Sequence, residues 1–186
     1  MTTAIRALLI CSLLLAGCRQ DSFPPLALAG DVDLARFMGD WYVIANIPTS
    51  LEKGAHNAVE SYRLAADGTV ETVFTFRDGS FDGPPRRYTP RGFVREGTGN
   101  SVWGMQFVWP VKADYRIAWL SQDYSQTVVG REARDYVWIM ARTPQITDAD
   151  YDTILRFVET QGYDVAKIQR VPQRWPETPA PGAGAP

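Results

Sequence analysis

Apolar and polar residues alternate with a period of two from residue 41 to residue 142, which is the pattern of β-strands that bury one face. In the clearest example every second residue is large and apolar: Trp103, Met105, Phe107 and Trp109. Turn signals such as Asp67-Gly68 separate the alternating segments. The pattern predicts eight strands, at residues 41–47, 57–64, 69–77, 87–96, 103–109, 115–119, 126–131 and 136–142. Periodicity alone leaves open whether they form a sandwich or an up-and-down barrel.

The period changes to 3.6 after Thr147, a capping residue, and the helical pattern ends at Gly162. One side of the predicted helix carries an apolar stripe: Tyr151, Ile154, Leu155 and Val158. We expect this stripe to pack on the outside of the sheet. Residues 163–171 then predict one further strand at the sheet edge. The fold class is therefore all-β with one C-terminal helix.

The first 17 residues have the composition of an export signal. Arg6 is their only charged residue, and the apolar run 7–16 is too short to span a bilayer. The segment Leu15-Ala16-Gly17-Cys18 resembles the lipobox of bacterial lipoproteins, which implies that Cys18 is lipidated; the alternative is an ordinary signal peptide with a chance cysteine. Because residue 19 is Arg and not Asp, the lipoprotein class implies an anchor on the periplasmic face of the outer membrane.

The rest of the chain predicts one domain between two irregular ends. Residues 18–32 contain Pro24-Pro25 and read as a lipidated tether, and residues 174–186 are rich in Pro, Ala and Gly and read as a disordered tail. Residues 33–173 suffice for one domain with a sizeable core. Cys11 leaves with the signal and Cys18 carries lipid, so no disulfide is expected and stability must come from the core.

Charge and composition exclude several function classes. The formal net charge of -2 argues against a nucleic-acid partner. His56 is the only histidine and lies in an expected loop, so a zinc site or a histidine-based triad would have too few ligands. The acidic residues Asp148 and Asp150 fit the first turn of a helix better than acid–base chemistry. We therefore expect no enzyme, no catalytic residues, no metal and no cofactor.

Three sequence motifs, in order, resemble those of the lipocalin family. Gly39-Asp40-Trp41 stands at the start of the first strand, Leu120-Ser121-Gln122-Asp123-Tyr124 resembles the second motif, and residues 136–144, which include Arg142, fit the third. With the lipobox and the ending Gly162–Ile168, they resemble bacterial outer-membrane lipoprotein lipocalins of the apolipoprotein D-like branch. The resemblance implies an eight-stranded antiparallel up-and-down barrel in which Arg142 stacks on Trp41 at the closed end, near a short helical turn after Asp33.

The resemblance also implies a non-enzymatic protein that holds a fatty acid or lysophospholipid in the barrel, for lipid storage or transport in cell-envelope maintenance. The alternating aromatic residues are the candidates for the cavity lining: Phe74, Phe76, Trp103, Phe107, Trp109, Tyr115 and Trp119. The alternative is that they fill a solid core, in a structural or assembly lipoprotein without a ligand. An exposed apolar strand face would permit a homodimer.

A group of arginines near the fourth strand has two interpretations: Arg86, Arg87, Arg91 and Arg95. They form either a solvated outer face or a patch that attracts an anionic lipid head group near the mouth of the barrel.

Overall fold

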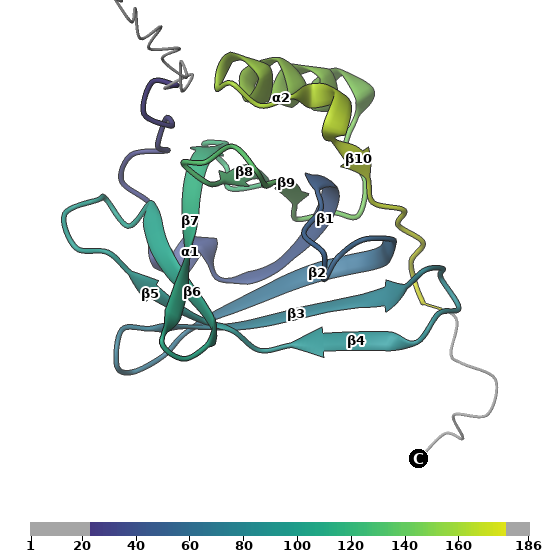
Figure 1. The fold of residues 1–186 in the computed structure, drawn as a ribbon, viewed down its shortest axis with the longest axis horizontal. Helices are drawn as coiled ribbons and strands as arrows, with labels where there is room; N and C mark the ends of the chain where they lie inside the picture. The colour runs from purple at the N-terminus through teal and green to yellow at the C-terminus, as the bar shows by residue number, and fades with distance from the viewer. Residues whose placement is uncertain (1–22, 178–186) are drawn as a thin grey trace, which may run out of the picture.

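The computed structural model describes residues 23–177, and its centre is a closed antiparallel barrel (Figure 1). The barrel strands, in chain order, are β1 Gly39–Ile47, β2 Ala55–Leu64, β3 Val70–Asp78, β4 Pro85–Tyr88, β5 Arg91–Val94, β6 Val102–Val108, β7 Val111–Leu120, β8 Gln126–Gly130 and β9 Val137–Ala141. Each strand pairs with its neighbour in the chain except that β3 pairs with both β4 and β5, and β1 pairs with β9 to close the barrel. Because β4 and β5 together occupy one strand position, the predicted eight-stranded barrel is confirmed.

The expected strand at residues 87–96 is divided into β4 and β5. Thr89 and Pro90 lie between them, and proline has no backbone N–H to donate to a ladder. β4 pairs with the second half of β3, whereas β5 pairs with its first half, at Val70 and Glu71. The Thr72 N–H still donates to the Pro90 carbonyl at 3.2 Å, so the wall continues across the break.

One end of the barrel is closed by the short helix α1, Leu34–Phe37. The Asp33 carboxylate caps this helix by accepting from two backbone N–H groups. The guanidinium of Arg142 lies 3.8 Å from the centroid of the fully buried Trp41 ring, and its Nη1 donates to the Asp40 carbonyl at 2.8 Å. Gly39 has φ +94°, and a Cβ there would lie 3.3 Å from the guanidinium, so the stack requires glycine at this position.

The loop after β7 joins this closed end. Asp123 accepts hydrogen bonds from the Ser121 hydroxyl and from the hydroxyl and N–H of Ser125, which together lower the pKa of its carboxyl to about 2. The Tyr124 hydroxyl accepts from the Asp33 N–H at 2.9 Å, and its carbonyl accepts from Arg142 Nε at 3.3 Å. Asp123 therefore holds the loop in shape, and Tyr124 joins the N-cap of α1 to Arg142, directly after β9.

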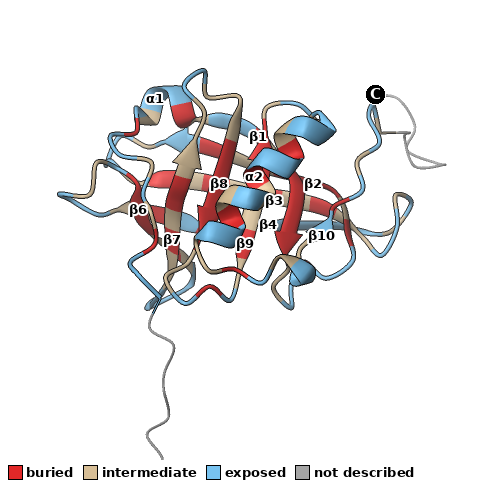
Figure 2. Cartoon of the chain, turned by 90° about the horizontal axis from the view of Figure 1, so that it is seen from above, coloured by how far each residue is buried: buried red, intermediate tan, exposed pale blue. Residues whose placement is uncertain are grey.

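A second apolar layer lies between the barrel and helix α2, Asp148–Thr160. Thr147 caps the helix by accepting from the Asp150 N–H at 3.1 Å. Tyr151, Ile154 and Val158 are the buried residues of α2, and they belong to one cluster with residues of β7, β8 and β9. Figure 2 shows α2 lying across the strands with its exposed residues on the outer side. None of the helices within residues 23–177 is both long and apolar enough to cross a membrane.

The predicted strand at residues 163–171 is wrong over most of its length. The Asp164 side chain accepts from the Ala166 N–H and starts a 3-10 turn, Val165–Lys167. Only β10, Gln169–Arg170, pairs with β1, at Ala45 and Asn46. The pairing of β1 with β2 ends at Tyr42, and β10 pairs with the edge of β1 that is left free beyond this residue.

Both ends of the described chain pack on the barrel beyond residues 33–173. In the segment expected to be a tether, Leu26 and Val32 are buried, and the Ala29 N–H donates to the Ile117 carbonyl at 2.9 Å. In the segment expected to be a tail, the Arg174 N–H donates to Asn57 at 2.7 Å and Glu177 forms an ion pair with Arg77. The expected signal peptide and Cys18 lie outside the described residues.

Candidate functional site

The barrel encloses a cavity of about 300 Å³ on the side away from the Trp41–Arg142 stack. This volume is at the lower limit of typical small-molecule sites. Most of the lining is apolar and comes from the interior faces of the strands and from the loops after β1 and β8. The apolar and aromatic lining residues are Leu51, Phe74, Tyr88, Pro90, Met105, Phe107, Ala113, Tyr115, Tyr136 and Trp138.

The structure places three of the seven expected lining residues at the cavity: Phe74, Phe107 and Tyr115. Two others are buried in the interior without lining the cavity. Trp103 stacks on Tyr115 with a centroid distance of 5.0 Å, on the side of the closed end. Phe76 packs against the ring of Phe74, with 5.2 Å between the two ring centroids.

The inward placement expected for Trp109 and Trp119 is wrong. β6 ends at Val108, so Trp109 lies in the turn that follows and is 82% exposed. Trp119 follows a β-bulge in β7. Between Ile117 and Trp119 the strand β7 advances by two residues, whereas its partner β8 advances by only one. A bulge reverses the alternation, and the Trp119 ring consequently lies outside the barrel, 6.5 Å from that of Phe157 in α2.

The aromatic pattern missed the polar residues of the cavity. Glu52, Glu60, Thr72, Asp114 and Arg131 all contribute to its lining. Strand parity could have found two of them, because Glu60 shares a face with inward-facing residues of β2 and Thr72 shares one with those of β3. The sequence gives no comparable signal for Glu52 and Arg131, which lie in loops.

Glu60 is the carboxylate closest to the aromatic base of the cavity. The Tyr62 hydroxyl donates to Glu60 Oε2 and lies 2.8 Å from the Tyr115 hydroxyl. Burial raises the pKa of Glu60 to about 7; the hydrogen bond from Tyr62 acts in the opposite direction, and the nearby Glu52 raises the pKa further. Burial also raises the pKa values of both tyrosines well above their ordinary range, so their hydroxyls remain protonated.

Glu52 is a structural part of the cavity wall. Its carboxylate accepts from Asn46 Nδ2 at 2.9 Å, from Trp138 Nε1 at 2.7 Å and from the Thr49 hydroxyl at 2.8 Å. Burial raises the pKa of Glu52, and these three hydrogen bonds act against that effect. Both oxygens are therefore occupied by protein donors, and they hold the loop after β1 against β9.

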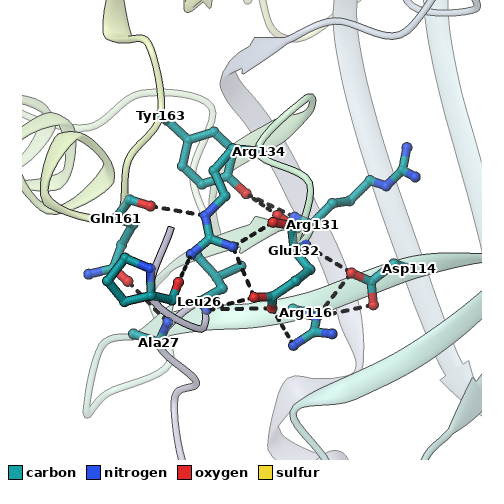
Figure 3. A network of polar contacts seen from close by, with 10 residues as sticks. Leu26, Ala27, Asp114, Arg116, Arg131, Glu132, Arg134, Gln161 and Tyr163 are labelled. Atoms are coloured by element: carbon teal, nitrogen blue, oxygen red, sulfur yellow. Dashed lines mark hydrogen bonds and ion pairs between the residues drawn. The ribbon is translucent and has the colours of Figure 1, made fainter. Parts of the chain in front are cut away.

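Charged residues brace the rim next to the loop after β8 (Figure 3). Arg116 forms ion pairs with Asp114 at 2.9 Å and with Glu132 at 2.6 Å, and the Glu132 N–H donates to Asp114. Arg131 forms an ion pair with Asp135 at 3.1 Å. Asp114 and Arg131, the charged lining residues at this side, therefore each have an ion-pair partner within the rim, whereas the buried Nε of Arg131 makes no hydrogen bond with any described residue.

The same rim holds the N-terminal segment (Figure 3). The nearly buried Arg134 donates to the Pro24 carbonyl at 2.6 Å and to the Gln161 carbonyl at 3.0 Å. The Leu26 N–H donates to Glu132 at 3.3 Å. These contacts join residues before the barrel, the loop after β8 and the end of α2 in one network.

The remaining candidate residues lie away from the cavity. The four arginines near the fourth strand are exposed and none of them lines it; Arg86 pairs with Asp78 at 2.7 Å and Arg91 with Asp67 at 3.3 Å. His56 lies edge-on to Phe81, with ring centroids 4.9 Å apart. Residues 23–177 contain no group of three His, Cys, Asp or Glu side chains that could hold a metal ion.

Comparison with known proteins gives consistent matches to one family. The family model described as a lipocalin-like domain matches residues 32–173. The chain is 27% identical over 167 residues to temperature-induced lipocalin-1 of Arabidopsis thaliana, covering 83% of this chain and 86% of that protein. It is 26% identical over 171 residues to outer membrane lipoprotein Blc of Escherichia coli K12, covering 86% of this chain and 90% of the relative.

Solved structures share the fold at low sequence identity. Insecticyanin from the tobacco hornworm Manduca sexta superposes with a TM-score of 0.63 at 14% identity, covering 80% of this chain and 85% of that one. The cockroach allergen Per a 4 superposes with a TM-score of 0.62 at 17% identity, covering 83% and 97%. At this level of identity the likeness concerns the barrel alone.

Proposed function

Because the chain belongs to the lipocalin family, we propose that it is a lipid-binding protein that holds the chain of a fatty acid or lysophospholipid in its barrel. The observation that carries the proposal is the apolar cavity of about 300 Å³ between the aromatic base and the rim. Apolar surface in such a cavity favours an acyl chain, whose burial contributes about 0.8 kcal/mol per methylene. The proposed activity is binding and not catalysis.

We further propose that lipidated Cys18 anchors the protein to the periplasmic face of the outer membrane. The lipobox supports this location, as do the names of the Escherichia coli and Vibrio cholerae relatives, which are outer membrane lipoproteins. In that setting the protein would store or transport lipids during maintenance of the cell envelope. The alternative of a filled barrel does not account for the cavity.

Titration of the delipidated full chain with palmitate and with a lysophospholipid tests the proposal. The chain would carry C18S so that no acyl group of its own competes, and tryptophan fluorescence would report binding because Trp138 lines the cavity. We expect saturable binding at micromolar concentrations. Failure of both ligands to bind to folded protein would refute the proposal.

Two substitutions at the same hairpin locate the binding site. Phe107 lines the cavity and is 50% exposed, whereas Trp109 does not line it and is 82% exposed. We expect F107D to weaken ligand binding about tenfold or more, because it places a charged side chain in the part of the cavity that the acyl chain of the ligand would occupy. W109D is the matched control and should leave the affinity nearly unchanged. A second cavity variant, A113F, should fill part of the space and weaken binding as well.

A further inference from the structure

Large apolar side chains are exposed around the mouth of the cavity. At the tip of the β6–β7 hairpin, Val108, Trp109 and Val111 are 72%, 82% and 68% exposed. Phe107 on β6 and Leu51 in the loop after β1 are half exposed, and both also line the cavity. We call Leu51 and residues 107–111 the apolar rim. Apolar surface therefore continues from the interior of the cavity onto the tip of this hairpin.

The apolar rim lies at the end of the barrel opposite to α1. β6 starts near the closed end, where the Asn100 side chain donates to the Val32 carbonyl at 2.9 Å, shortly before α1. The strand runs from there to Phe107 at the cavity. Leu51 follows β1, which starts next to the stack of Arg142 on Trp41. Both elements thus bring apolar residues to the open end.

Packing within the described chain does not explain these residues. None of residues 107–111 belongs to either of the two apolar clusters formed by residues 23–177. The turn that joins β6 to β7 has only two residues, Trp109 and Pro110, and such hairpin turns favour glycine, asparagine and aspartate. Exposed apolar surface of this kind marks a site of interaction.

The charges around the apolar rim favour an anionic partner. Lys53 in the loop after β1 and Lys112 on β7 are exposed, and neither forms an ion pair within residues 23–177. The carboxylates in the other loops of this end all have cationic partners: Asp82, Glu132 and Asp135. Each lysine close to an anionic lipid surface strengthens attachment about fivefold.

The segment before the barrel approaches from the same end. Arg134 and Glu132, in the loop after β8, bind the backbone of Pro24 and Leu26. Two other residues of this loop line the cavity, so the loop lies at the open end. A membrane anchor at Cys18 would therefore bring the apolar rim, and not α1, close to the bilayer.

We propose that the apolar rim inserts into the surface of an anionic phospholipid bilayer, with Trp109 at the tip and with Lys53 and Lys112 among the headgroups. Tryptophan suits this interface because its ring is apolar and its N–H can still contact water or headgroups. Since the cavity opens within the rim, an acyl chain would pass from the bilayer along Phe107 into the barrel without crossing water. This role in lipid exchange rests on the proposed function, whereas insertion is measured without a ligand.

Co-sedimentation with vesicles tests the insertion. The protein is the chain from residue 18 onward carrying C18S, so that neither the export signal nor an acyl group contributes to binding. The vesicles consist of phosphatidylcholine with or without phosphatidylglycerol. We expect wild type to bind the anionic vesicles, and V108D and W109D each to weaken this binding about tenfold or more.

Matched variants separate insertion from charge and from position. L64D adds the same charge at Leu64, which is 41% exposed at the end of β2 near the closed end, and should bind like wild type. W109S adds no charge and should still weaken binding several-fold. K53Q and K112Q should each weaken binding to anionic vesicles about fivefold and leave binding to pure phosphatidylcholine unchanged. Unchanged affinity of W109D for palmitate shows that the barrel is still folded.

Brominated phospholipids, which quench tryptophan within the bilayer, report insertion directly. Quenching should be strong in wild type and should fall in W109F. W175F is the control and should keep it, because Trp175 packs edge-on to Tyr42 on β1, with ring centroids 5.4 Å apart, and not at the rim.

The outcomes separate the inference from the proposed function. Equal vesicle binding by wild type, W109D and L64D, or quenching that W109F leaves unchanged, would overturn the inference. A wild-type dimer that W109D converts to a monomer, without vesicle binding, would overturn it in favour of a second copy of the chain as the partner. Palmitate binding without vesicle binding would overturn the inference alone. Vesicle binding by folded protein that takes up neither palmitate nor a lysophospholipid would support insertion and refute the proposed function.

Discussion

Glu60 should make the stability of the protein depend on pH. Its pKa rises from the ordinary value of 4.5 to about 7 on folding, chiefly because the carboxylate loses water. Between these two values the folded state binds more protons than the unfolded state, so the free energy of unfolding falls as the pH rises. The contribution of Glu60 is therefore fully present below about pH 4.5 and is lost as the pH passes through about 7.

The magnitude follows from the two pKa values. Their difference corresponds to about 3 kcal/mol, at roughly 1.4 kcal/mol for each pH unit. Since part of Glu60 faces the cavity, contact with solvent reduces the effect, and we expect about 2 kcal/mol. The side chain at position 60 of E60Q cannot ionise, so this variant should lose the contribution of Glu60 and be more stable than wild type at about pH 8.

Urea denaturation at about pH 5 and about pH 8 measures the effect for wild type, E60Q and E96Q. Glu96 is exposed in the turn after β5, so E96Q should keep the wild-type difference between the two pH values. The raised pKa of Glu52 contributes with the same sign, which means that E60Q should reduce the dependence without abolishing it. An identical pH dependence in wild type and E60Q would refute the reasoning.

Two further predictions concern packing. R142A should lower the free energy of unfolding by about 3 kcal/mol in urea titrations, because it removes the stack on Trp41 and the hydrogen bonds to the α1 carbonyls. An effect below about 1 kcal/mol would contradict the stabilising role of Arg142 at the closed end. W119A should lower the free energy of unfolding by about 1–2 kcal/mol, because the ring loses its contact with α2, whereas W109A should change it by less than about 0.5 kcal/mol. A larger effect of W109A than of W119A would contradict the packing of Trp119 against α2.

Local sequence rules describe the barrel well because each of its strands has one face toward an apolar interior. Alternation and turn residues located the eight strand positions, and the capping residue Thr147 located the outer helix. These rules failed at the β-bulge in β7, where two residues of β7 face one residue of β8. Nothing in the residues around Ala118 distinguishes a bulge from a regular strand, and the pairing with β8 decides where the Trp119 ring points.

The polar part of the cavity was missed for a related reason. Aromatic residues on one parity predict an apolar interior, but they do not show which of them lie at the base. Trp103 is inward-facing and nevertheless lies beneath the cavity, because Tyr115 covers it. Glu60 and Thr72 have the parity of interior residues, and only the arrangement of strands around them shows that they face open space.

The contacts of Pro24 and Leu26 with the rim fix where the chain leaves the barrel. The described chain begins at Phe23, next to the loop after β8 and the end of α2, and this loop contributes Arg131 and Tyr136 to the cavity. If Cys18 carries the proposed lipid, five peptide links separate the anchor from Phe23, a reach of at most about 18 Å. A tether of this length would hold Phe23, and with it the loop after β8, within about 18 Å of the anchored residue, so that the mouth of the barrel and not the end closed by Arg142 would lie near the bilayer. A ligand could then exchange with the membrane over a short path.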